Sequence, residues 1–99
     1  MEVVILSGAE ADLDELHAQA EKTGGGERLL LAVDRELELI RNFPQLVPVS
    51  LQARVRRVRI KRTPYGVFYT IEGSRVMILA IQDLRQDPEA IAKAIRRRL

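Results

Sequence analysis

The sequence predicts an α+β fold: an N-terminal strand, an antiparallel helix hairpin packed on a small, mainly antiparallel sheet, and a short C-terminal helix. Two observations predict it. Apolar residues in the first half of the chain recur with the period of a helix, whereas from about residue 54 they alternate with charged residues, as in a strand. The resulting order β-α-α-β-β-β-α places the helices on one face of a sheet. At 99 residues the chain has the length of one domain, which we assign to residues 1–99.

The N-terminal elements are a strand and a helix. Glu2–Leu6 is a short, β-branched apolar run, which is typical of a strand. Ser7 and Glu10 have the spacing of a capping box, in which each side chain binds a backbone amide of the first turn, so a helix is expected from about residue 8 to 22. Thr23-Gly-Gly-Gly26 ends this helix, because glycines favour a turn.

A second helix is expected from about residue 27 to 41, since one of its faces is apolar, with Leu30, Val33, Leu37 and Ile40. Asn42-Phe-Pro44 ends it, because the residue before a proline resists the helical conformation. The short glycine turn makes the two helices an antiparallel pair. Residues 45–52 follow as a loop.

The C-terminal half begins with a basic strand. From Arg54 onward, the apolar residues Val58 and Ile60 alternate with a cationic stripe formed by Arg57, Arg59 and Lys61. The simplest interpretation of such a stripe is a solvated strand face, but six cations within residues 54–62 exceed what solubility requires. The segment is therefore a candidate binding surface.

A hairpin and a helix complete the chain. Residues 65–72 and 75–82 are expected to pair across a glycine-containing turn. The second of these strands is apolar at every position from 76 to 81, as in a central strand covered on at least one face. Asp87-Pro then opens a helix that ends at Arg96–Arg98.

Charge is divided between the two halves of the chain. Residues 1–49 contain four Lys/Arg against ten Asp/Glu, a net charge of −6, whereas residues 50–99 contain twelve against four, a net charge of +8. Such asymmetry concerns partners rather than fold. It predicts that a polyanion or an acidic protein segment meets the C-terminal half.

Composition excludes several classes of site. The chain has no cysteine and one histidine, so disulfides, thiolate zinc sites and multi-histidine metal sites are excluded. His17 shares a helix face with Asp14 and Glu21, which is most simply a solvated face. No apolar run approaches the roughly 20 residues of a membrane span, and no signal peptide is visible. We expect a cytoplasmic protein without cofactor, metal or membrane contact.

Residues 7–13, 24–30 and 42–44, and most sharply residues 55–73 and 76–88, together form a specific pattern. In this pattern the sequence resembles the RelE/ParE toxin superfamily of bacterial type II toxin–antitoxin modules. The resemblance implies a toxin that arrests growth through a macromolecular target and is neutralised by a cognate antitoxin protein. In this superfamily the antitoxin typically wraps a segment around the toxin, often over its basic surface. Operator DNA is then contacted only through the antitoxin.

The superfamily divides into two mechanisms. RelE-like members cut mRNA on the ribosome, and ParE-like members poison DNA gyrase. The RelE-like pattern carries basic residues that fall on Arg57, Arg59 and Arg85, but its further arginine falls on Gly66 and its C-terminal tyrosine near Ile91. ParE-like members commonly carry His-x-Arg-Arg-x-Pro after the last strand, where this chain has glutamine for the histidine. We therefore slightly favour gyrase inhibition; a ribosome-dependent ribonuclease and a non-catalytic, attenuated binding module remain alternatives.

Two sets of candidate site residues follow. RNA cleavage needs a proton acceptor, a proton donor and cations beside the phosphate. The candidates for these roles are Arg57, Arg59, Lys61, Arg85, Tyr65 and Tyr69. A tyrosine base would need a large shift of its pKa from about 10, and the aromatic residues Tyr65, Phe68 and Tyr69 are more simply core residues. The candidates for target binding are Arg54, Arg56, Arg57, Arg59, Lys61, Arg62 and Arg85.

Overall fold

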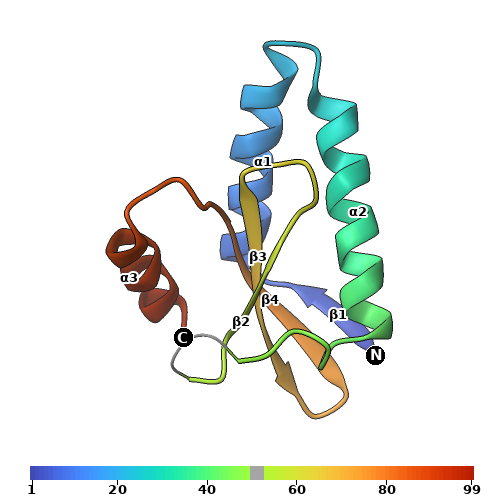
Figure 1. Cartoon of the computed structure of the whole chain (residues 1–99), viewed down its shortest axis with the longest axis vertical. Helices are drawn as coiled ribbons and strands as arrows, with labels where there is room; N and C mark the ends of the chain where they lie inside the picture. The colour runs from blue at the N-terminus through green and yellow to red at the C-terminus, as the bar shows by residue number, and fades with distance from the viewer. Residues whose placement is uncertain (50–52) are drawn as a thin grey trace.

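A computed structural model of the chain describes residues 1–49 and 53–99. The predicted order of elements is confirmed (Figure 1). The elements are β1 (Glu2–Ile5), α1 (Ser7–Glu21), α2 (Gly26–Asn42), β2 (Arg56–Arg59), β3 (Tyr65–Glu72), β4 (Arg75–Asp83) and α3 (Pro88–Arg98). Among the helices of the described residues, none combines the length and the apolar character that a membrane span requires.

The four strands form one mixed sheet in the order β1-β4-β3-β2. β1 runs parallel to β4, and the other neighbours are antiparallel. The predicted hairpin joins β3 and β4 through Gly73, whose φ of 61° lies in the left-handed region that glycine adopts without strain. β2 is therefore an edge strand, and β4 lies in the interior of the sheet.

Helices cover both faces of the sheet (Figure 1). The α1–α2 hairpin packs on one face, over side chains that include Val67, Tyr69 and Ile78. The prediction that every helix lies on the same face is wrong for α3, because its Ile91 and Ile95 pack with Phe68 on the opposite face. The fully apolar β4 explains the difference: it presents side chains to both faces, and the second face needs a cover.

A β-bulge in β4 adjusts which side chains reach each helix layer. Phe68 pairs with Ala80 and Tyr69 with Ile78, so Leu79 has no partner residue on β3. The extra residue breaks the alternation of the strand. As a result, Ile78 and Ile81 both face α1 and α2, while Leu79 and Ala80 both face α3.

The predicted capping box at the start of α1 is wrong. Ser7 is the first residue of the helix, and Leu6 occupies the N-cap without a side-chain hydrogen bond. The reason is that the chain passes from β1 into α1 without a spare residue: the Leu6 amide donates to Ile78 O, and Leu6 O accepts from the Glu10 amide. The other boundaries of the two N-terminal helices differ from the prediction by one residue.

The basic strand is shorter than predicted. It begins at Arg56 rather than at Arg54, because Ala53 and Arg54 have left-handed backbone angles, with φ of 57° and 61°. The predicted loop lies partly outside the described residues, at 50–52; before that gap, Val49 forms an isolated antiparallel bridge to Arg56. The edge strand is therefore only four residues long, and three of them are arginines.

Candidate macromolecule-binding site

Arg57 and Arg59 form an exposed cationic pair on the α3 side of the sheet. They lie opposite Phe68 and Gly66 in β3, and Phe68 packs against α3. The Arg59 Nε donates a hydrogen bond of 2.8 Å to Thr63 O, which holds this side chain along the end of β2. The helix α3 covers the same face and carries the exposed cations Lys93, Arg96 and Arg97, of which Arg96 is paired with Glu89 at 3.2 Å. We call Arg57, Arg59 and these three α3 residues the basic face.

The other cations of the segment do not join this face. Arg56 points to the opposite side of β2 and donates to the carbonyl oxygen of Val47, so it holds the preceding loop. Arg54 lies in the turn before the strand. The alternation was predicted to continue to Lys61, but β2 ends at Arg59 and the chain turns. Lys61 and Arg62 consequently line a groove beneath α2. The predicted stripe of Arg57, Arg59 and Lys61 is therefore divided between two surfaces.

Of the two candidate tyrosines, Tyr69 is fully buried. Its hydroxyl donates to Pro44 O at 2.8 Å. Burial raises the pKa of this hydroxyl; the nearby Arg56 lowers it and Glu36 raises it by smaller amounts. Tyr65 is half-buried and lines the groove beneath α2. The core interpretation of Phe68 and Tyr69 is confirmed, and the Tyr69 hydroxyl is already bound to the backbone.

Arg85 lies beyond the end of β4 and is exposed. Its Nε donates to Asp83 Oδ1 at 3.0 Å and its terminal nitrogen to Asp83 Oδ2 at 2.7 Å. The hydrogen bonds from Arg85 lower the pKa of Asp83. The guanidinium is thus oriented by a neighbouring carboxylate, as a positioned cation rather than a freely moving one.

Two positions that differ from the RelE-like pattern have packing roles. Gly66 is buried beneath Leu84, and a Cβ on Gly66 would lie 2.8 Å from Leu84 Cδ2. A larger side chain there requires Leu84 to move. Ile91, where that pattern has a tyrosine, is 7% exposed and belongs to the apolar cluster between α3 and the sheet. Both positions therefore hold buried residues without a polar side chain, where the RelE-like pattern has polar side chains.

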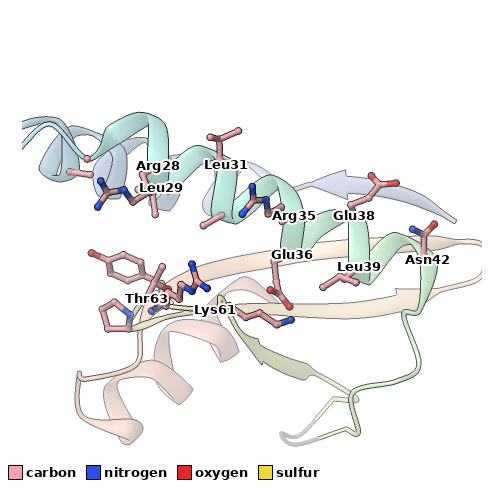
Figure 2. A pocket seen from close by; sticks show the side chains of 16 residues that line it. Arg28, Leu29, Leu31, Arg35, Glu36, Glu38, Leu39, Asn42, Lys61 and Thr63 are labelled. Atoms are coloured by element: carbon pink, nitrogen blue, oxygen red, sulfur yellow. Dashed lines mark hydrogen bonds between the residues drawn. The ribbon is translucent and has the colours of Figure 1, made fainter.

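An open groove separates α2 from the turn between β2 and β3 (Figure 2). Its α2 wall carries the exposed Leu31 and Leu39, and the turn contributes Lys61 and Arg62. Glu36 points from α2 toward the sheet, and only 5% of this residue is exposed (Figure 2). Sequence analysis missed Glu36, although its spacing of three residues from Val33 and four from Ile40 places it on the buried face of the helix.

A second feature that sequence analysis missed is a charged cluster between α1, β4 and α3. Arg98 donates to both Asp12 oxygens, at 2.6 and 2.9 Å, and to Leu79 O at 3.0 Å. Asp12 Oδ2 also accepts from the Ile81 amide at 2.9 Å and from Gln82 at 3.0 Å. β1 ends opposite Ile78. Beyond that residue, these side chains form hydrogen bonds with the backbone groups of β4 that β1 does not cover.

The fold is that of a RelE/ParE-type toxin. Residues 3–88 match the family described as ParE toxin of type II toxin-antitoxin system, parDE. A solved structure described as the chromosomal ParDE TA system from P. aeruginosa is 25% identical, with a TM-score of 0.67 over 85% of this chain and 96% of that chain. Comparison with curated proteins gave no match.

The chain belongs to the ParE toxin family of type II toxin–antitoxin systems. The resemblance inferred from residues 55–73 and 76–88 is thereby confirmed, as is the preference for the ParE-like branch. A toxin of this class acts together with an antitoxin. The residues that contact the target remain a prediction.

Proposed function

We propose that this toxin arrests growth by binding DNA gyrase, and that Arg57 and Arg59 contact the target. The observation that carries the proposal is that Arg57 and Arg59 are exposed on the basic face, whereas the candidate base Tyr69 is buried and its hydroxyl donates to Pro44 O. Cleavage of RNA requires proton transfer as well as charge stabilisation. A surface that supplies only positive charge favours binding of an anionic or acidic partner.

The residues at the positions where the RelE-like pattern carries its functional side chains support the same proposal. Gly66 lies beneath Leu84, Ile91 is in the core, and the Tyr69 hydroxyl is bound to Pro44 O. Gly66 and Ile91 have no side-chain group that transfers a proton, and the Tyr69 hydroxyl would have to leave Pro44 O to act on RNA. Membership of the ParE family adds support, because ParE-like toxins are the gyrase-directed branch of the superfamily.

We further propose that a cognate antitoxin of the ParD type neutralises the toxin by covering its cationic surfaces. The description of the matching family names a parDE system. The net charge of +8 on residues 50–99 suits an acidic antitoxin segment, and so does the exposure of Arg57 and Arg59. The antitoxin would then compete with the target for the same side chains.

The test is induced expression without antitoxin, with DNA replication and protein synthesis followed separately. The wild-type toxin should block replication while the mRNA pool stays intact, and purified toxin should inhibit supercoiling by purified gyrase. The double variant Arg57→Ala/Arg59→Ala should lose both effects, because the proposed contacts are gone.

The matched control is Lys22→Ala/Arg41→Ala, which removes two exposed cations distant from the basic face. It should still arrest growth. Equal loss in both double variants would mean that general charge, not this pair, is responsible. A rapid collapse of translation with cleaved mRNA would contradict gyrase as the target and would favour the ribonuclease mechanism instead.

A further inference from the structure

The turn between β2 and β3 is held by hydrogen bonds centred on Thr63. The Thr63 hydroxyl donates to Ile60 O at 2.8 Å and accepts from the Tyr65 amide at 3.1 Å. The Ile60 amide donates to Tyr65 O at 2.8 Å, and the Thr63 amide donates to Ile60 O at 3.1 Å. One side chain therefore joins the two ends of the turn, because its hydroxyl serves a carbonyl on one side and an amide on the other.

The same turn holds one cation of the basic face. The Arg59 Nε donates to Thr63 O at 2.8 Å. The two terminal nitrogens of this guanidinium form no hydrogen bond or ion pair with the residues that the structure describes. A pair of terminal guanidinium nitrogens binds a carboxylate or a phosphate with two parallel hydrogen bonds. Arg59 is thus oriented by the turn and still available to an anionic group.

The neighbouring arginines lack this combination. Arg57 is exposed and forms no hydrogen bond or ion pair within the described part of the chain, so nothing there orients it. Arg85 is oriented, but its Nε and a terminal nitrogen both donate to Asp83, at 3.0 and 2.7 Å. A carboxylate of the chain itself therefore already occupies one side of the Arg85 guanidinium. Of these three arginines, Arg59 is the one that is both oriented and available.

The form of the turn depends on the Thr63 hydroxyl. Arg62 has a φ of 65°, in the left-handed region that is unfavourable for a residue with a Cβ. Such a conformation persists only where the surrounding structure holds it. Without the hydroxyl, the Tyr65 amide loses its acceptor, and the Thr63 carbonyl can rotate away from Arg59.

We infer that Thr63 is a positioning residue for binding of the target. Its hydroxyl fixes the turn, the turn holds the Arg59 Nε, and the terminal nitrogens of Arg59 stay oriented for an anionic group of the target. The inference rests on the proposed binding of gyrase and adds a residue that acts through Arg59. An oriented side chain loses less conformational freedom on binding than a mobile one, which increases affinity.

The first experiment measures inhibition of purified gyrase by full-length toxin variants in a supercoiling assay. Thr63→Val keeps the shape of the side chain and removes the hydroxyl. The half-inhibitory concentration should rise about three- to tenfold, which corresponds to ordering one mobile side chain on binding. Thr63→Ser retains the hydroxyl and should inhibit as the wild type does.

The matched control is Thr23→Val in the turn after α1. It also removes a hydroxyl that donates to a backbone carbonyl, that of Ala20 at 3.2 Å, but this hydroxyl does not hold a cation of the basic face. The control should inhibit as the wild type does. Urea unfolding of all three variants verifies that they fold.

The second experiment follows the Arg59 side chain in free toxin by NMR. The Arg59 Nε–H signal, assigned by its loss in Arg59→Lys, should exchange slowly with water in the wild type and in Thr63→Ser, and rapidly in Thr63→Val. The Arg57 Nε–H signal is the internal reference and should exchange rapidly in every variant, because no described residue accepts its hydrogen.

Inhibition by Thr63→Val equal to that of the wild type would overturn the inference, as would an equal loss in Thr63→Ser or in Thr23→Val. A slowly exchanging Arg59 signal in Thr63→Val would also overturn it, because the hydroxyl would then not hold this side chain. A wild-type toxin that does not inhibit gyrase would overturn the proposed target instead. The NMR comparison does not involve gyrase, so it still decides whether Thr63 holds Arg59.

Discussion

The two faces of the sheet are covered by different means. Beneath α1 and α2, the cluster that includes Val33, Tyr69 and Ile78 is extensive and almost entirely apolar. Beneath α3 the apolar cluster is smaller, and the charged pair Arg98–Asp12 adds hydrogen bonds to the edge of β4. One face therefore depends on non-directional burial, whereas the other depends partly on directional bonds.

This difference predicts which part of the toxin should unfold first. The α1–α2 face is covered by a large apolar cluster, whereas the attachment of α3 relies on Ile91, Ile95 and one ion pair, so α3 should open before the two N-terminal helices. Since α3 also carries cations of the basic face, its attachment bears on the proposed function.

The largest effect is expected from Ile78→Ala. Ile78 is fully buried at the centre of the α1–α2 face, and removing its methyl groups leaves a cavity. The free energy of unfolding should fall by about 3–4 kcal/mol, measured by urea denaturation. Ile95→Ala is the matched change on the other face and should cost somewhat less, about 2–3 kcal/mol. Equal losses, with equal hydrogen exchange throughout, would mean that the two faces form one cooperative unit without a weaker side.

A smaller loss is expected from Asp12→Ala, about 2–3 kcal/mol in the free energy of unfolding. The change leaves the Arg98 guanidinium and the Ile81 amide without their acceptor, and both are partly buried. Hydrogen exchange of α3 should increase more than that of α2. Asp14→Ala is the control, since Asp14 is an exposed neighbour on the same helix. An equal increase of hydrogen exchange in α2 and α3 would contradict a local role for the Asp12–Arg98 ion pair.

The smallest effect is expected from Tyr69→Phe, at about 1 kcal/mol near neutral pH, because one buried hydrogen bond to Pro44 O is lost. The variant should also change the pH dependence of stability. Because the folded-state pKa of Tyr69 is raised, the folded protein holds the proton more tightly; this contribution is complete below about pH 10 and is lost as the pH rises further. Urea unfolding between pH 8 and 11 should show a smaller decline in Tyr69→Phe than in the wild type. An identical decline would assign alkaline unfolding to other groups.

Much of the fold could be predicted from local patterns. The limits of β3 were predicted to the residue, and the helices to within one residue. Periodicity and glycine turns are local, so they can be read from neighbouring residues. The cap of α1 was mispredicted because Ser7 and Glu10 have the spacing of a capping box. In the structure, the Leu6 amide donates a hydrogen bond to Ile78 O, and Leu6 rather than Ser7 becomes the N-cap.

The candidate site could be predicted only in part. Arg57 and Arg59 share a surface as expected, because alternation holds within β2. Lys61 was assigned to the same surface, but the strand ends before it. Tyr69 could be assigned to the core by residue type, whereas its bond to Pro44 O depends on how the loop after α2 folds back.

Residue types and short spacings are enough to establish the order of elements, the charge division between the halves and the family resemblance. Only the tertiary structure decided that α3 covers the second face, that the basic segment divides between two surfaces, and that Asp12 meets Arg98 across 86 positions. It also decided that Glu36 faces the groove. The physical reason is that such contacts arise where distant segments pack together, and the need to satisfy buried polar groups acts on neighbours in space rather than on neighbours in sequence.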